Sequence, residues 1–99
     1  MHEVNLKIER ADQLHKITVI SKDGCHLCER VVDKLKELST GGGFKLEIVE
    51  ITKDRSTYEK YFLRIPVVQL DDKDVFEVED IALPTDCKLK LETLVSHLD

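Results

Sequence analysis

The segment DGCHLCER, residues 23–30, contains two cysteines separated by two residues, with a glycine immediately before the first cysteine. Two thiols at this spacing can close a disulfide, contribute to a metal site, or pack as small residues in a protein core. The residues on either side of the segment bear on this choice, because they determine where in the fold the cysteines lie.

A strand, a loop and a helix are predicted around the two cysteines. Residues 17–20 (ITVI) form a short apolar run rich in β-branched side chains, which favours a strand, and the polar residues 21–24 follow as a loop. From His26 onward the apolar residues recur at intervals of three and four, the period of an amphipathic helix. They are Leu27, Val31, Leu35 and Leu38. The predicted helix therefore begins at the cysteines, and the glycines 41–43 end it.

A second strand and a short helix are predicted after the glycines. Apolar and charged residues alternate from Phe44 towards residue 51, which is the period of a strand. The pattern STYE then favours a helix with Ser56 as its N-cap and Glu59 completing a capping box. At helical spacing its aromatic residues are expected to pack in the core; they are Tyr58, Tyr61 and Phe62.

Two more strands and a final helix complete the predicted elements. Residues 65–70 and 75–78 flank a polar turn, as the two strands of a hairpin would. The last helix is predicted to begin after Pro84, with Thr85 or Asp86 as its N-cap. Its apolar stripe is Cys87, Leu91, Leu94, Val95 and Leu98. This position makes Cys87 a buried core residue rather than a third redox group.

The element order βαβαββα predicts an α/β protein with a four-stranded mixed sheet flanked by helices. With 99 residues and 41% hydrophobic content, the chain is expected to form one domain, residues 1–99. Residues 1–16 fit this pattern less well and are treated as an N-terminal extension. Within them, Val4, Leu6 and Ile8 alternate as an additional edge strand would.

Charge and hydropathy exclude several classes of partner. The formal net charge is −5 and acids and bases interleave, whereas nucleic-acid binders concentrate positive charge on one face. The sequence has no run of about 18 apolar residues and no apolar core of a signal peptide, so we expect no membrane partner and a cytoplasmic location. In that reducing compartment a CxxC pair is more plausibly catalytic, redox-sensing or metal-binding than a static disulfide.

The position at a helix start predicts different chemistry for the two thiols. Cys25 lies at the N-terminal end, where unpaired N–H groups and the helix dipole favour a thiolate. Lys22 and, when protonated, His26 add positive charge that favours the same thiolate. Cys28 lies almost one turn later beside apolar residues and is expected to be less exposed. This asymmetry suggests an attacking thiol and a resolving thiol.

At this point the sequence resembles a known family. The segment ISKDGCHLC after a strand, IPVV at residues 65–68 and the order βαβαββα together resemble the glutaredoxin-like members of the thioredoxin superfamily over residues 17–98. The closest resemblance is to small glutaredoxin-like proteins with a GCHLC active site. It implies a thioredoxin-like fold and thiol–disulfide oxidoreductase activity, with Cys25 as nucleophile and Cys28 as resolving thiol.

The resemblance also implies a substrate site. Lys22 corresponds to a lysine that dithiol glutaredoxins carry three positions before the first cysteine, Pro66 to a proline in cis, and Ile65 to the residue whose backbone pairs with the substrate. With His26, these residues are the expected substrate-binding set. The implied substrate is a disulfide-containing protein or glutathione, which is a candidate co-substrate, and an upstream thiol reductant would reopen the disulfide. No metal and no organic cofactor is required, and the oligomeric state is not indicated.

Two departures from the glutaredoxin pattern keep other interpretations open. His26 and Leu27 stand where proline and an aromatic residue are usual, and residues 76–81 read FEVEDI where paired glycines are usual. The alternative function is a non-enzymatic binding module, or a protein that holds a metal or iron–sulfur cluster with Cys25 and Cys28. A closed metal site needs about four ligands, and the chain has no second CxxC pair to supply them.

Overall fold

The computed structural model describes residues 14–98 and contains one four-stranded mixed sheet, as the sequence predicts. The strands are β1 (His15–Ser21), β2 (Phe44–Glu50), β3 (Val67–Leu70) and β4 (Lys73–Phe76), and their order in the sheet is β2-β1-β3-β4. The central strand β1 runs parallel to β2 and antiparallel to β3, which pairs antiparallel with β4. The edge strand predicted over Val4, Leu6 and Ile8 lies outside the described residues.

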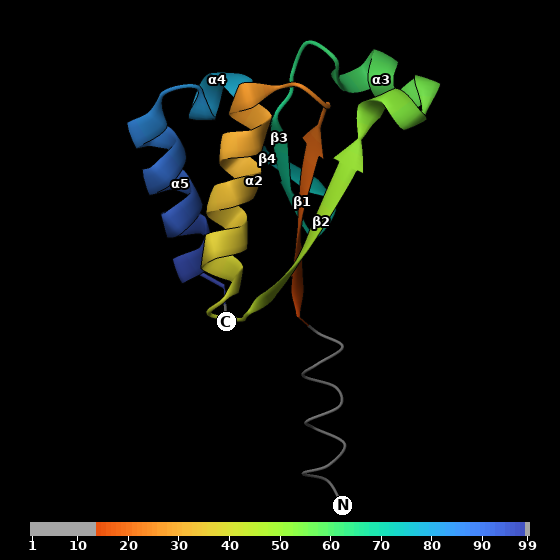
Figure 1. The fold of residues 1–99 in the computed structure, drawn as a ribbon. Helices are drawn as coiled ribbons and strands as arrows, with labels where there is room; N and C mark the ends of the chain where they lie inside the picture. The colour runs from red at the N-terminus through yellow and green to blue at the C-terminus, as the bar shows by residue number, and fades with distance from the viewer. Residues whose placement is uncertain (1–13, 99) are drawn as a thin grey trace, which may run out of the picture.

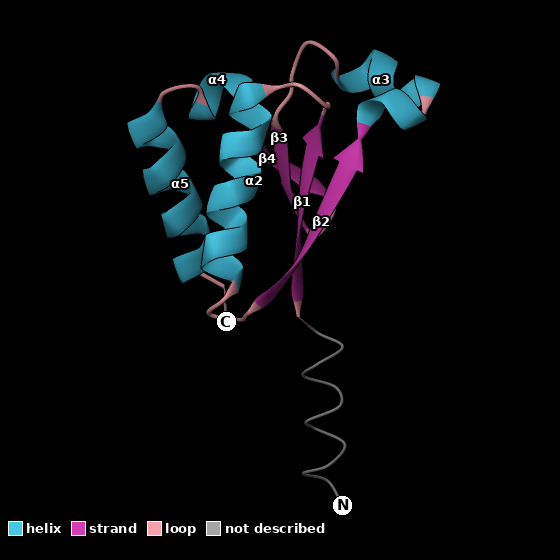
Figure 2. Ribbon diagram, in the orientation of Figure 1, coloured by secondary structure: helices cyan, strands magenta, loops and turns pink. Residues whose placement is uncertain are grey.

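Helices cover both faces of this sheet. Helices α2 (His26–Ser39) and α5 (Pro84–Ser96) lie side by side on one face, and α3 (Arg55–Tyr61) lies on the other (Figures 1 and 2). A short 3-10 helix, η1 (Ile51–Lys53), joins β2 to α3, and a short helix, α4 (Val78–Ile81), joins β4 to α5. No helix within residues 14–98 combines the length and apolar character needed to cross a membrane.

Alternation along the strands produces a core on each face. On the face of α2 and α5, Ile17, Val19 and Val68 are fully buried against apolar residues of both helices. On the opposite face, Ile20 and Val67 pack with Tyr61 of α3. Successive residues of a strand therefore point alternately into the two cores, as the two-residue period of a strand requires.

Helix α3 differs from the prediction at its start and on its outer side. Its N-cap is Asp54 rather than Ser56, because the backbone is extended at Asp54 (φ −144°, ψ 122°) and the helix begins at the next residue. Of its predicted core aromatics only Tyr61 is buried; Tyr58 and Phe62 are exposed and stack on each other with ring centroids 5.3 Å apart.

The segment before the last helix also differs from the prediction. Residue Val78, predicted to be in a strand, begins α4 instead. Helix α5 begins at Pro84, with Leu83 at the N-cap position, rather than at Thr85 or later. Proline is well tolerated in the first helical turn, because the N–H that it lacks would have no partner in the helix. Cys87 is buried as predicted, and burial raises the pKa of its thiol.

Strand register brings three loops to one end of the sheet. Ile20 pairs with Val67 between the antiparallel strands β1 and β3, so residues 65 and 66 lie beside the end of β1. Figure 1 shows this end with the start of α2, the connection from α3 to β3, and α4. The end of the sheet that follows β1 therefore carries both the cysteine segment and the Ile65–Pro66 segment.

Candidate functional site

The loop after β1 places Cys25 at the very start of α2. Gly24 has a positive φ of 83°, a conformation that residues with a side chain rarely adopt, and the Cys25 N–H donates to the Lys22 carbonyl at 3.1 Å. The Cys25 backbone is extended (φ −91°, ψ 107°) and its carbonyl accepts the first helical hydrogen bond, from the Glu29 N–H. Cys25 is therefore the N-cap residue of α2.

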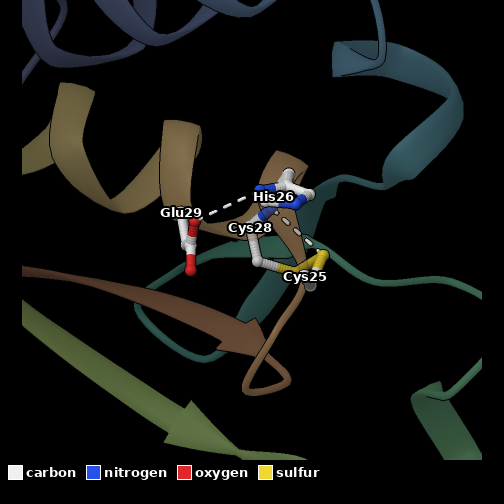
Figure 3. Close-up of a disulfide and its surroundings, with 4 residues drawn as sticks. All are labelled: Cys25, His26, Cys28 and Glu29. Carbon is white, nitrogen blue, oxygen red and sulfur yellow. Dashed lines mark hydrogen bonds and ion pairs between the residues drawn. A yellow bond between two sulfur atoms is a disulfide. The ribbon is translucent and has the colours of Figure 1, made fainter.

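The Cys25 sulfur takes the place of an N-cap oxygen. Its Sγ accepts a hydrogen bond from the Cys28 N–H at 3.1 Å, one of the backbone donors that a helix start otherwise leaves without a partner (Figure 3). In the reduced protein the same donor and the positive end of the helix dipole would favour a thiolate at this sulfur.

Cys28 is joined to Cys25 by a disulfide in this structure, with their Cα atoms 5.2 Å apart. Cys28 is only 2% exposed, whereas Cys25 is half-buried. The predicted difference in accessibility between the two cysteines is thus present: Cys25 is the more exposed of the two.

The structure places the two predicted cationic residues at the rim of the site. The His26 side chain is 95% exposed, and its Nδ1 lies 3.6 Å from a Glu29 carboxylate oxygen (Figure 3). Lys22 is also exposed. Its charge acts on Glu50, whose carboxyl pKa is lowered first by the Thr52 hydroxyl hydrogen bond and, to a smaller extent, by Lys22.

Glu50, which sequence reasoning missed, caps η1 close to the cysteine loop. Its carboxylate accepts hydrogen bonds from the Thr52 hydroxyl at 2.7 Å and the Thr52 N–H at 3.1 Å. The nearby backbone of Asp23 also lowers the pKa of this carboxyl, to a smaller extent than Thr52 does. An acidic residue at a strand end followed two positions later by threonine is a local signal for such a cap. Asp23, however, is distant in sequence, and no local pattern indicates that its backbone lies near Glu50.

A groove of about 250 Å³ reaches Cys28 from the side of β2. Its charged lining residues are Lys22, Asp23, Glu29, Asp33 and Lys36. Charged residues therefore line the groove beside the buried cysteine.

The predicted substrate residues Ile65 and Pro66 lie at the same end of the sheet as the cysteine segment. The Ile65–Pro66 peptide bond is cis, as the family resemblance implied. Ile65 is half-buried against the core under α3, and Pro66 is buried. The structure thus brings the Ile65–Pro66 segment to the end of the sheet where Cys25 and Lys22 lie; His26 points to solvent at the rim.

Within residues 14–98, no group of three or more histidine, cysteine, aspartate or glutamate residues is arranged to hold a metal ion. Cys25 and Cys28 would supply two ligands of a shared cluster, and a second copy of the chain or another molecule would have to supply the rest.

The sheet order, the covering helices and the CxxC pair at a helix start define a glutaredoxin-like domain of thioredoxin fold. The family described as Glutaredoxin-like domain (DUF836) matches residues 16–98, and the chain belongs to this family. A search of curated proteins found no match.

Solved structures agree with this fold. The solution NMR structure of protein Ne2328 from Nitrosomonas europaea has a TM-score of 0.62 and 26% sequence identity, covering 88% of this chain and 94% of that one. A mutant thioredoxin from Halobacterium salinarum NRC-1 also has a TM-score of 0.62, at 17% identity, covering 97% of this chain and 85% of that one. At this low identity the thioredoxin likeness concerns the fold alone.

Proposed function

We propose that this protein is a thiol–disulfide oxidoreductase that works through Cys25 and Cys28. The observation that carries the proposal is the placement of Cys25 as the N-cap of α2, with its sulfur accepting the Cys28 N–H, while Cys28 is buried directly behind it. A nucleophilic thiol needs thiolate character and access, and a resolving thiol needs proximity and protection from other disulfides.

The exchange takes place in two balanced steps. The Cys25 thiolate attacks one sulfur of a substrate disulfide, forming a mixed disulfide and releasing the other sulfur as a thiolate that takes a proton from water. Cys28 then loses its proton and attacks the Cys25 sulfur, which forms the Cys25–Cys28 disulfide and releases the second substrate thiol. Two electrons pass from the protein to the substrate, and an upstream thiol reductant returns them.

The proposed substrate is a disulfide-bearing protein or a glutathione mixed disulfide, in a reducing compartment such as the cytoplasm. The substrate would lie between Cys25 and the Ile65–Pro66 segment, with the backbone of Ile65 pairing with it and with Lys22 and His26 at the rim. Glutathione is a candidate co-substrate.

Replacement of single cysteines tests this proposal. With a protein disulfide and a glutathionylated peptide as substrates, Cys25→Ser should abolish exchange, and Cys28→Ser should accumulate a mixed disulfide visible by mass spectrometry. Cys87→Ser is the matched control, because Cys87 is a buried core residue of α5 and should leave exchange largely intact. Reductase activity retained by Cys25→Ser would exclude the proposed mechanism.

The competing proposal is that the fold binds a partner or a shared cluster without catalysing exchange. An exposed apolar surface favours this proposal, because it offers area for a partner. It consists of the stacked pair Tyr58 and Phe62 and of the neighbouring Leu63, which is 78% exposed. Colour and metal content of freshly purified protein test the cluster version. A coloured, metal-loaded preparation that loses its metal in Cys25→Ser would support it; a colourless, metal-free one would count against it.

A further inference from the structure

The residue directly before the Ile65–Pro66 segment is held by an unusually complete set of contacts. Arg64 Nε donates to one carboxylate oxygen of Glu77 at 3.1 Å, and its Nη2 donates to the other at 3.0 Å. The same Nη2 donates to Asp74 at 2.7 Å. The guanidinium also lies over the ring of Tyr61, 5.0 Å from its centroid.

The main chain at Arg64 is tied to the same region. The Arg64 carbonyl accepts the Val78 N–H at 3.1 Å, and the Arg64 N–H donates to the Tyr61 carbonyl at 2.8 Å. Arg64 is thus attached to the junction between β4 and α4 through its side chain and its carbonyl. Its N–H is attached to Tyr61, the last residue of α3.

The acidic partners of Arg64 are themselves fixed. Gln69 of β3 donates to Asp74 at 2.8 Å and to the Tyr61 hydroxyl at 3.3 Å. The Glu77 N–H donates to the Asp80 carboxylate at 2.9 Å, which fixes the first turn of α4. A chain of polar contacts therefore runs from α3 through Arg64 to the start of α4, two elements that flank the Ile65–Pro66 segment in sequence.

We infer that Arg64 is a positioning residue that holds the Ile65–Pro66 segment and the start of α4 against the end of the sheet where Cys25 lies. The inference rests on the proposed function for its effect on catalysis. A bidentate guanidinium–carboxylate pair fixes orientation as well as distance, which a lysine cannot do because it is a point charge on a flexible stem. The carboxylates of Glu77 and Asp74 bind Nε and Nη2 of the guanidinium, so these donors hold parts of the same chain together.

The test compares Arg64→Met, Arg64→Lys and the matched control Arg55→Met, all in the full chain. Arg55 is the first residue of α3, its side chain is 92% exposed, and its ion pair with Glu59 is long, at 3.5 Å. Thermal melts identify a temperature at which every variant is folded, so that differences in activity do not reflect unfolding. Glu77→Gln keeps Arg64 and weakens only one pair, and it replaces Arg64→Met if that variant does not fold.

Two measurements separate positioning from catalysis. Hydrogen exchange at the Val78 amide should be about tenfold faster in Arg64→Met than in wild type. The acceptor of this amide is the carbonyl of residue 64, which the guanidinium contacts no longer hold in place in that variant. In Arg55→Met the exchange rate should be unchanged. Turnover of a peptide disulfide should show kcat/KM lowered about tenfold or more, mainly through a higher KM, since a displaced segment misplaces the substrate. Arg64→Lys should be intermediate, and the pH profile of Cys25 alkylation should stay close to wild type.

Each outcome decides the inference. Wild-type exchange at Val78 in Arg64→Met, or wild-type kcat/KM in that variant when the wild-type protein is active, would overturn it. If the wild-type protein itself shows no disulfide exchange, the proposed function fails, and hydrogen exchange at Val78 alone decides whether Arg64 positions the segment.

Discussion

The sulfur of Cys25 occupies the position that a serine or aspartate oxygen takes at most helix starts. A thiolate accepts the Cys28 N–H better than a neutral thiol does, so the hydrogen bond at 3.1 Å and the helix dipole both stabilise the charged form. Glu29, in the first turn of α2, adds a negative charge at the same end, and its largely exposed carboxylate lies 3.6 Å from His26 Nδ1.

We predict that the pKa of Cys25 in the reduced protein lies below the ordinary value of a thiol, because the helix N-terminus favours the thiolate. Alkylation of reduced protein across pH, with the modified site assigned by mass spectrometry, measures it. Cys28 should react more slowly at every pH because it is 2% exposed, and Cys87 should react only after unfolding. A Cys25 profile centred near pH 8.5 would remove the electrostatic basis for assigning it as the nucleophile.

Helix ends show where sequence reasoning was insufficient. The body of α2 was predicted correctly because Val31 and Leu35 repeat the helical period and are fully buried. The start of α3 was not, because Asp54 and Ser56 are both good capping residues, and the backbone conformation at the end of η1 determines which of them caps the helix.

We predict that Asp54→Ala destabilises the protein more than Ser56→Ala does. The Asp54 carboxylate accepts hydrogen bonds from the Thr57 N–H at 3.0 Å and the Thr57 hydroxyl at 2.7 Å, whereas the Ser56 hydroxyl only donates to Asp54, at 2.8 Å. Urea denaturation of both variants at neutral pH measures the difference. An equal decrease in the free energy of unfolding for both variants, or a larger decrease for Ser56→Ala, would favour the capping box predicted from the sequence.

The long-range side-chain contacts around the site could not be predicted from the sequence. Periodicity and turn residues predicted the order of strands and most of the helices, since these signals are local. Arg64 binds Asp74 and Glu77, ten and thirteen residues away, and Glu50 lies near the backbone of Asp23; such pairs leave no periodic pattern. Helix α4 was missed because Val78 continues the alternation of Phe76 and therefore reads as strand.

A similar long-range contact joins the β3–β4 turn to the start of β1 across the sheet. Asp71 and Asp72 both have positive φ, 50° and 72°, as the tight turn of a two-residue hairpin requires. The Asp71 carboxylate accepts hydrogen bonds from His15 Nδ1 at 2.6 Å and from the Lys16 N–H at 2.9 Å, and the Asp71 N–H donates to the Lys16 carbonyl. These contacts fasten the hairpin to the central strand.

This contact predicts a specific dependence of stability on acid. The His15 side chain first, and then the Lys16 N–H, lower the pKa of Asp71 below its ordinary value of 3.8. A carboxyl whose pKa is lower in the folded than in the unfolded state contributes stability that is fully present above the unfolded value and is lost as pH falls through the folded value. Asp71→Asn should therefore reduce the free energy of unfolding near pH 6 and make its decline below about pH 4 shallower than in wild type.

Urea denaturation of oxidised protein at pH steps from 6 downward tests this prediction. Asparagine tolerates positive φ, so the substitution leaves the turn conformation accessible while it removes the charge and one of the two acceptor oxygens. Asp72→Asn is the matched control in the same turn: its ion pair with Lys16 is largely exposed, with the Asp72 side chain at 74%, and exposed pairs contribute little to stability. The explanation is wrong if Asp71→Asn follows the wild-type acid profile, or if Asp72→Asn changes the slope as much, because the loss would then come from the turn as a whole and not from the carboxylate that fastens it to β1.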